Sequence, residues 1–506
     1  MHPLATSTSA ASPGPRVVII GAGMAGICLA IRLKQSGCTA VRIFEKSDDV
    51  GGTWLHNTYP GAACDIPSFL YCYSFAPKYD WTHLFAPQSE ILDYVRDCAD
   101  RFDVRRHVEF GTAVIEAVYD DARAAWTVRT DRGETIEADV VVSAVGQLQR
   151  PAIPALPGLD DFQGPMFHSA RWNHDCSLVG RAVAVIGNAA SAVQLIPPVA
   201  EQARRTFVFQ RTPNWISPLN NRRYSRVARW MFAHVPGRAR VHRARLYLEH
   251  ELRFAFLRRR GFVNRCLAFQ LRHRMRSRIA EPLRGRLIPE YEAGCKRVLL
   301  SDRYLQALHR DDVELVTDPI TRITADSIVT AGGERRVDAI VLATGFEAGR
   351  FLSPIAVRGR DGRRLEDAWP GRPRTYLGLM TPGFPNFFML YGPNTNLGHN
   401  SIVMMIECQV HYLLGCVRAM RRRGVQAIDV RHDVVERFDR GQQKALDKTA
   451  WNGGCTNWYK TSGGAIVNNW HATVAAYWLR TRRPRLGDFE LIRRPAVPPA
   501  DSASGR

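Results

Sequence analysis

Residues 16–37 read RVVIIGAGMAGICLAIRLKQSG, and this stretch decides the fold. The short apolar run at 17–20 predicts a buried strand, and a helical pattern follows it. Between them, Gly21, Gly23 and Gly26 stand at GxGxxG spacing. In that order, such glycines permit a tight turn, close approach of the backbone to a pyrophosphate, and close packing of helix on strand. The stretch therefore predicts a dinucleotide-binding unit.

An acidic residue follows the next predicted strand of this unit. In VRIFEK, residues 41–46, Glu45 lies 19 residues past Gly26. A carboxylate at this distance accepts a hydrogen bond from a ribose 2′-hydroxyl and repels a 2′-phosphate. We therefore expect the first unit to bind FAD or NAD, and not NADP.

A second, altered copy of the signal is RAVAVIGNAASAVQLIP, at 181–197. Gly187 keeps the first glycine, whereas Ala189 and Ala192 replace the other two, and the methyl group of Ala189 would stand close to a pyrophosphate. Arg211 and Thr212 follow the next strand, where a guanidinium suits a 2′-phosphate. We expect an NADPH site here, with Ser191 and Gln194 on its helix. The alternative is a Rossmann-like half that no longer binds nucleotide.

Two near-repeats return the chain to these units. DVVVSAVG at 139–146 and DAIVLATGF at 338–346 each contain an acid, an apolar strand, small residues and a glycine. Two dinucleotide units in one chain predict an enzyme that passes electrons from a nicotinamide to a flavin.

The positive charge of the chain is concentrated in one segment. The net charge is +21, and residues 222–286 hold nineteen Arg, no Lys and three Glu, which is +16. This segment has a helical, amphipathic pattern. A solvated helical subdomain explains it, and the alternatives are attraction of an anionic cofactor or substrate and contact with a membrane surface. It has no recognisable DNA- or RNA-binding module, so we expect no nucleic-acid partner.

Cysteine usage and the chain start bear on the compartment. The eleven cysteines are scattered and form no CxxC pair, which favours reduced thiols in the cytoplasm over a disulfide framework. Residues 1–13 resemble a disordered leader more than a signal peptide. No run of about 18 apolar residues is present, so we expect no transmembrane helix. We also expect no metal.

Three segments together resemble one family. GGTWLHNTYPGAACDIPS at 51–68, FQGPMFHSARWN at 162–173 and AGCKRVLLSDRYLQALHRDDVELV at 293–316 are similar to segments of the Baeyer–Villiger monooxygenases, which are class B flavoprotein monooxygenases. The middle segment, a loop by its lack of periodicity, fits the family fingerprint FxGxxxHxxxW; Asn173 stands where the family has Pro or Asp. The fingerprint residues are Phe162, Gly164, His168 and Trp172.

This resemblance implies a reaction and its residues. NADPH would reduce FAD, O2 would give a C4a-peroxyflavin, and attack on a small-molecule ketone would yield an ester or lactone. A fixed cation suits this chemistry because it stabilises developing anions in a dry site. By resemblance, Arg297 is the catalytic cation, Asp65 orients it near the flavin, and Lys296 binds the NADPH 2′-phosphate. His168 would help to coordinate domain movement, or it would only pack the linker.

The same resemblance implies further cofactor contacts. Trp458 matches a C-terminal aromatic that touches NADP+. The residues implied for FAD are Gly52, Thr53, Trp54, Tyr71, Val114 and Asn396.

We therefore predict an α/β protein with two Rossmann-like dinucleotide-binding domains and a helical insert. The expected parts are a leader at 1–13, an FAD-binding domain at 14–149 and 381–490, an NADPH-binding domain at 150–220 and 295–380, an Arg-rich insert at 221–294, and a disordered tail at 491–506.

Three other functions stay open at this stage. A related flavin monooxygenase would place oxygen on N or S, with less need for an Arg–Asp pair. A disulfide reductase would need a close cysteine pair near the flavin, and Cys64 and Cys72 stand eight apart. A flavin-binding scaffold without NADPH turnover is supported only by Ala189.

Overall fold

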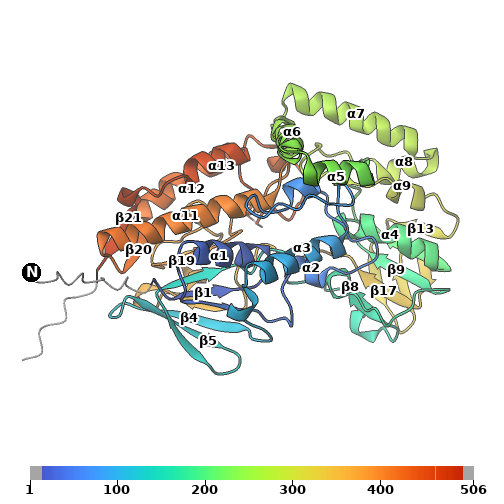
Figure 1. Cartoon of the computed structure of the whole chain (residues 1–506). Coiled ribbons are helices and arrows are strands. Elements are labelled where there is room, and N and C mark those ends of the chain that lie inside the picture. Colours follow the sequence, from blue (N-terminus) through green and yellow to red (C-terminus); the bar gives the residue numbers. More distant parts are fainter. Residues whose placement is uncertain (1–13, 462, 494–506) are drawn as a thin grey trace, which may run out of the picture.

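The computed structural model of the protein describes residues 14–461 and 463–493. Two parallel sheets form the centres of two units with the same plan, and a group of helices projects beside them (Figure 1). The predicted α/β architecture with two Rossmann-like units and a helical insert is therefore confirmed.

The first unit is built around the strand predicted at 17–20. Each central strand is almost wholly buried, because the sheet is covered on both faces. All neighbours in the sheet are parallel, and across it the strands are β19 (Phe387–Met389), β7 (Val140–Ser143), β1 (Val17–Ile20), β2 (Val41–Phe44) and β3 (Val108–Glu109).

Side chains alternate between the two faces of β1. Val17 and Ile19 pack among the helices, whereas Val18 and Ile20 pack against a β-meander. The helices are α1 (Met24–Gln35), α3 (Gln88–Arg101) and α11 (Ile402–Arg423), and in Figure 1 α1 and α11 lie above the sheet with the meander below. The meander strands are β4 (Val114–Asp120), β5 (Ala125–Thr130) and β6 (Thr135–Ala138).

The chain returns to the first unit earlier than predicted. β18 (Ala356–Arg358) pairs in parallel with β4, and Leu352, Ile355 and Leu365 belong to the meander's core. The boundary predicted between 380 and 381 is therefore wrong, because this short edge strand is too brief to show a pattern in the sequence.

The second unit repeats the plan. Val183 and Val185 face helices, including α4 (Ala190–Gln202) and α9 (Tyr304–Ala307), while Ala184 and Ile186 face a three-stranded meander. The parallel sheet runs β13 (Val313–Val316), β10 (Arg205–Phe209), β9 (Ala182–Ile186), β17 (Ala339–Leu342) and β8 (Met166–His168). The meander strands are β14 (Ile320–Ile323), β15 (Ser327–Thr330) and β16 (Gly333–Arg336).

The fingerprint segment is not wholly a loop. Its centre forms the edge strand β8, which the sequence did not indicate because only three residues pair with β17. Gly164 is required by space, since a Cβ there would lie 2.7 Å from the Phe162 ring and 2.9 Å from the carbonyl oxygen of Asp338. Trp172 packs edge-on against Phe167, with ring centroids 5.0 Å apart.

The Arg-rich insert leaves and re-enters the second unit at one point, where β11 (Ile216–Ser217) and β12 (Leu299–Leu300) pair in parallel. Between them lie four helices, as predicted: α5 (Arg226–His234), α6 (Arg238–Leu252), α7 (Phe262–Arg278) and α8 (Glu281–Leu287).

The C-terminal part packs on the first unit. It contains α12 (His432–Leu446), α13 (Val474–Thr481) and an antiparallel pair of strands, β20 (Ala427–Val430) and β21 (Phe489–Ile492). The tail expected from 491 is thus wrong at its start, because Leu491 and Ile492 belong to β21. The leader at 1–13 and residues 494–506 lie outside the described residues. Among the described helices, only α11 is long and apolar enough to span a membrane, and it packs against α1 and α13.

Candidate active site

Both units begin with a glycine that no other residue could replace. Gly21 has φ +103°, and a Cβ there would lie 2.9 Å from the Ala144 carbonyl oxygen. Gly187 has φ +112°, and its Cβ would lie 2.3 Å from the Ala343 carbonyl oxygen. Ala144 and Ala343 come from the two near-repeats of the sequence. In each unit the segment after the repeated strand therefore packs against the glycine turn, a contact that the sequence did not predict.

Of the remaining glycines of the first turn, Gly26 is needed for packing, whereas a Cβ at Gly23 would make only an ordinary contact, 3.6 Å from the Gly52 Cα. A Cβ at Gly26 would lie 2.0 Å from the carbonyl oxygen of Gly21, which is far inside contact distance. Gly23 lies opposite Gly52, whose own Cβ would stand 3.1 Å from the Gly23 Cα. The predicted Glu45 is buried, and its carboxylate accepts hydrogen bonds from the N–H of Ala22 at 2.7 Å and of Ser47 at 2.9 Å. Glu45 therefore fixes the turn while its further lone pairs stay able to accept a ribose hydroxyl.

The segment after Gly52 runs beside this turn. Thr53 starts the short helix α2 (Thr53–His56) and is exposed, whereas Trp54 is buried and donates from Nε1 to the Tyr71 hydroxyl at 3.2 Å. Val114 is buried in the core of the meander. Of these predicted residues, Gly52 lies directly against the first turn, and Trp54 and Tyr71 contact each other.

A group of buried polar side chains faces the same unit. Asn396 accepts from the Tyr391 hydroxyl at 2.9 Å and donates to Asn469 at 3.2 Å. Asn469 Nδ2 and Gln147 Oε1 are buried without a protein hydrogen-bond partner. Such atoms are costly unless a ligand or water satisfies them. This donor and acceptor set fits a polar ring system such as the flavin of FAD.

The second turn has a different set of neighbours. Ala189 is exposed at the start of α4. Ser191, on the first turn of that helix, is partly buried. Gln194 accepts from the Tyr59 hydroxyl at 2.8 Å and donates to the Ala63 carbonyl at 2.9 Å. Gln194 therefore ties the second unit to the 51–68 segment, a role that the sequence did not suggest.

The three residues predicted for the 2′-phosphate come together. Lys296 Nζ donates to Thr212 Oγ1 at 2.7 Å and lies 5.0 Å from the centre of the Tyr291 ring. Burial, and then the charge of Arg211, lower the pKa of Lys296. Two cations that repel each other beside a hydroxyl donor form a site that an anion would stabilise.

Asp65 and Arg297 form an ion pair between two distant segments. Arg297 donates from Nε at 2.9 Å and from Nη2 at 2.6 Å, both to Asp65 Oδ2. Both side chains are about one-quarter exposed. The Asp65 charge raises the pKa of Arg297 still further, so the guanidinium stays charged at any working pH. The pair joins the 51–68 segment to the segment that carries Lys296.

Two tyrosines beside this ion pair were missed from the sequence. Burial raises the pKa of Tyr459 to about 12, and it raises the pKa of Tyr391 also, although the charge of Arg297 opposes both shifts. Both tyrosines therefore remain neutral hydroxyl groups close to the guanidinium. They stand in quoted motifs, YGPNTN and CTNWYK, but nothing in one sequence separates such tyrosines from core residues.

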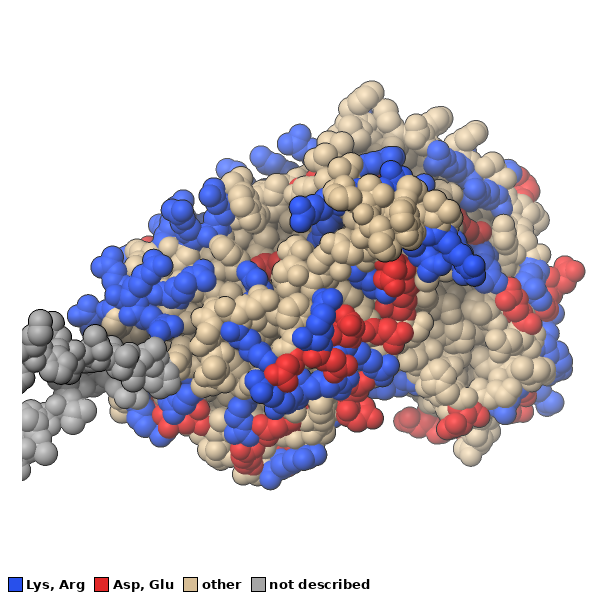
Figure 2. Space-filling model, viewed as in Figure 1, with Lys and Arg blue, Asp and Glu red and all other residues tan. Residues whose placement is uncertain are grey.

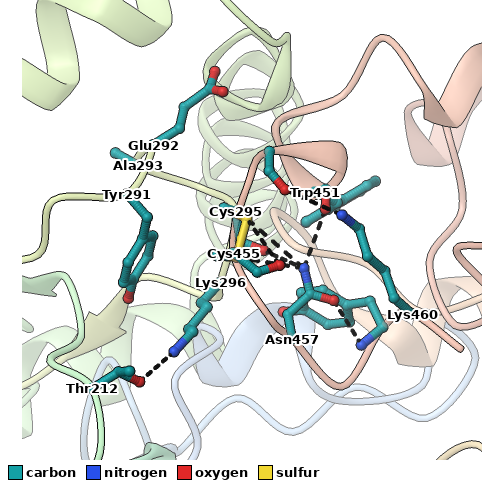
Figure 3. The surroundings of a disulfide bond; sticks show 12 residues. Thr212, Tyr291, Glu292, Ala293, Cys295, Lys296, Trp451, Cys455, Asn457 and Lys460 are labelled. Carbon is teal, nitrogen blue, oxygen red and sulfur yellow. Dashed lines mark hydrogen bonds between the residues drawn. A yellow bond between two sulfur atoms is a disulfide. The ribbon is translucent and has the colours of Figure 1, made fainter. Parts of the chain in front are cut away.

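A disulfide contradicts the expectation of only reduced thiols. Cys295 and Cys455 are bonded, and nine cysteines are free in the described residues. The bond fastens the C-terminal loop next to Lys296, and Asn457 donates to the Cys295 carbonyl at 3.0 Å (Figure 3). Trp458 lies on this loop, is 42% exposed, and contacts the Tyr459 ring. Nothing in the sequence indicated the bond, because its partners are 160 residues apart.

His168 has the character of a packing residue. It is buried, its Nδ1 accepts from the N–H of Ala170 at 3.1 Å, and its ring lies 5.8 Å from the Phe346 ring. Burial lowers its pKa to about 4, so the side chain is neutral near pH 7. Its contact with the return segment of the second unit is compatible with either predicted role, and the role in domain movement stays a prediction.

Two dinucleotide-binding units that meet around a partly buried ion pair define a flavin- and nicotinamide-type oxidoreductase. Residues 14–353 match the flavin-binding monooxygenase-like family. A Baeyer–Villiger monooxygenase of Streptomyces coelicolor is 40% identical, over 94% of this chain and 93% of that protein. The chain therefore belongs to the flavin-binding monooxygenase-like family, and its predicted resemblance is confirmed.

Solved structures agree with this assignment. An oxidized steroid monooxygenase bound to NADP is 33% identical, with a TM-score of 0.86, and the match covers 95% of this chain and 99% of that one. OTEMO in complex with FAD and NADP is 31% identical, with a TM-score of 0.84 over 95% of this chain and 100% of that one.

Proposed function

We propose that the chain uses FAD, NADPH and O2 to convert a small-molecule ketone into an ester or lactone. The observation that carries this proposal is the ion pair of Asp65 and Arg297, which holds a permanent cation between the two nucleotide-binding units. The relatives named Baeyer–Villiger monooxygenase support the same reaction class.

The first unit, residues 14–149 with the returning chain from β18 onward, would hold FAD. Its N–H groups at the start of α1 suit a pyrophosphate, and Glu45 suits a ribose hydroxyl. Gln147, Asn396 and Asn469 supply polar atoms for the ring system.

The second unit would hold NADPH. Arg211, Thr212 and Lys296 supply two charges and a hydroxyl for the 2′-phosphate. The methyl group of Ala189 adds no backbone strain, since its φ of −83° is ordinary for any residue. The scaffold alternative rests on the closeness of this methyl group to a pyrophosphate, and it is tested by whether NADPH bleaches the bound flavin.

Bound FAD, once reduced by NADPH, supplies the activation of O2. Arg297 would stabilise the negative charge that develops on oxygen atoms during attack on the ketone, because a preorganised cation needs no reorganisation when the reaction occurs. Asp65 would act as a positioning residue, since it receives two hydrogen bonds from the guanidinium. Tyr459 would offer a hydroxyl donor beside it, and Tyr391, whose own hydroxyl donates to Asn396, would help to exclude water.

The test compares two steps in one variant. Arg297→Ala should lower ester formation from a panel of cyclic and linear ketones by about 100-fold or more, the typical loss for one oxyanion donor. Flavin reduction by NADPH should continue. Arg297→Lys is the matched control that keeps charge but loses the paired hydrogen bonds.

The outcomes separate the reactions. Ester formation by Arg297→Ala at the wild-type rate would remove the assigned role. Oxygen transfer to a sulfide by the wild-type enzyme, with no ketone turned over, would favour the N- and S-oxidising alternative. We further propose a cytoplasmic location, which the nine free cysteines support.

A further inference from the structure

The outer face of the helical insert gathers exposed apolar side chains. Of the eighteen large hydrophobic residues exposed in the described part of the chain, ten lie on α5–α7 or beside them. They are Val227, Trp230, Val235, Val241, Leu248, Leu252, Phe262, Val263, Leu267 and Phe269. We call these ten residues the insert face. Scattered exposed apolar residues are normal in any protein, but this concentration in one segment is not.

The spacing of these residues gives each helix an apolar outer side. On α6, Val241, Leu248 and Leu252 are seven and then four residues apart, which places them on one face. On α7, Phe262 and Phe269 are also seven apart. Leu252, Phe262 and Phe269 are 75%, 76% and 74% exposed. These side chains therefore point away from the protein core.

Positive charge surrounds the insert face. Figure 2 shows tan residues at the top of the molecule, where Figure 1 places α6 and α7. Lys and Arg side chains lie next to these tan residues. Arg274, Arg276 and Arg278 are exposed on the second half of α7 and form no ion pair with the described residues. The segment's three Glu are all engaged: Glu249 with Arg245, Glu251 with Asn400 and α13, and Glu281 with Arg284.

Charge and apolar exposure together select the partner. A second copy of the chain would bring the same excess of +16 in residues 222–286 and would be repelled. A nucleic acid would balance the arginines but would leave the Leu and Phe side chains in water. An anionic lipid surface satisfies both, since its headgroups attract arginine and its acyl region accepts apolar side chains. We propose that the insert face docks the protein on an anionic lipid bilayer.

The inner side of the insert explains how docking leaves the site intact. Arg243 of α6 donates to the Cys72 carbonyl at 3.3 Å, and the Phe254 ring lies 5.2 Å from the His399 ring. Leu257 packs with Trp451 and Tyr459. The insert therefore contacts the candidate active site with one side and presents the insert face with the other. Docking is a binding property and stands whether or not the ketone reaction is correct.

Vesicle flotation of the full-length, FAD-loaded protein tests this directly. The protein should float with vesicles that contain phosphatidylglycerol and stay behind with pure phosphatidylcholine. Replacing Leu252, Phe262 and Phe269 together by Ser should weaken binding to the anionic vesicles by about tenfold or more, because three apolar side chains leave the interface. Arg274, Arg276 and Arg278 changed to Gln should weaken it in a salt-dependent way.

Matched controls lie elsewhere on the surface. Ile153→Ser with Val179→Ser removes two other exposed apolar residues, which are 56% and 69% exposed. Arg421, Arg422 and Arg423 changed to Gln remove an exposed basic run, and both variants should bind as wild type does. The proposal is overturned if the wild type ignores anionic vesicles at physiological ionic strength, or if the Ser variant binds them as tightly as wild type. It is also overturned if an oligonucleotide binds the insert and the apolar substitutions leave vesicle binding unchanged.

Discussion

The first nucleotide-binding turn keeps three glycines, whereas the second keeps one, yet both turns have the same backbone. Gly23 and Ala189 each precede a helix with nearly equal angles, φ −77° and ψ −172° against φ −83° and ψ −161°. Conformation therefore does not explain the glycine at 23. Protein packing does not explain it either, since a Cβ at Gly23 would lie an ordinary 3.6 Å from the Gly52 Cα. The explanation is the close approach of a pyrophosphate that the motif predicts at this position.

The third position shows the same contrast more strongly. Gly26 leaves no room for a Cβ beside Gly21, but Ala192 has one and is fully buried. Helix α4 must therefore stand further from its turn than α1 does. The two units also hold different charges at the ribose, with Glu45 in one and Arg211 near Lys296 in the other. A motif thus reports local packing and ligand charge, and an incomplete motif is still compatible with an intact turn.

The largest effect on FAD content is expected from placing the second unit's residue in the first. Gly26→Ala should destabilise the protein by about 1–3 kcal/mol, the usual cost of overpacking, and it should lower the FAD content of the purified protein. Ala192→Gly should keep FAD and cost only about 1 kcal/mol, from helix propensity. Thermal unfolding and flavin absorbance measure both. A Gly26→Ala protein with full FAD content and unchanged Tm would contradict the packing argument.

The disulfide marks a second difference between the units. In the second unit, the bond from Cys295 to Cys455 ties the segment that carries Lys296 to a C-terminal loop. Cys455→Ser should lower stability by about 2–4 kcal/mol, because the bond closes a long loop, and it should raise the KM for NADPH by freeing Trp458. Reductant should have the same effect on the wild type and none on the variant. Cys266→Ser removes an exposed free thiol and serves as the control. If Cys455→Ser and Cys266→Ser had the same stability and the same KM for NADPH, the disulfide would have no role in NADPH binding.

The next effect concerns the charged residue expected to bind the 2′-phosphate of NADPH. Arg211→Ala should raise the KM for NADPH by about tenfold, the worth of one charged hydrogen bond, and should leave the KM for NADH nearly unchanged. Steady-state kinetics with both nucleotides measure this. Glu45→Ala is the counterpart in the first unit and should weaken FAD retention without changing the choice between NADPH and NADH. An equal loss with NADPH and NADH in Arg211→Ala would sink the assignment of the 2′-phosphate site.

The smallest effect at neutral pH belongs to His168. Its pKa is about 4 in the folded protein against an ordinary 6.5, so the folded state binds fewer protons than the unfolded state. The stability that its neutral form contributes is present above pH 6.5 and is lost as pH falls toward 4, by about 3 kcal/mol in all. His168→Gln should reduce this acid loss in urea unfolding curves. An unchanged slope would assign the loss to other buried histidines, such as His250 and His471.

Much of the fold followed from short apolar runs. The strands at 17–20 and 182–186 appear where predicted because a strand buried on both faces needs uninterrupted apolar residues. β8 and β18 were missed because three-residue edge strands depend on their neighbours and not on their own pattern.

The site divides in the same way. Glu45 and Arg211 were predicted because their charges suit a nucleotide, whereas Lys296 and the pairing of Asp65 with Arg297 were implied by resemblance. Tertiary contacts that bring distant segments together left no signal. The disulfide, the tyrosines beside Arg297 and the bridging of Gln194 to the 51–68 segment are of this kind.

The central claim is that the two units, with their different turns, work on one pair of cofactors. Anaerobic mixing of the FAD-loaded protein with NADPH tests it most directly, with the flavin absorbance as readout. The account predicts rapid bleaching by NADPH and slower bleaching by NADH at equal concentration. A protein that holds FAD and bleaches with neither nucleotide would contradict it.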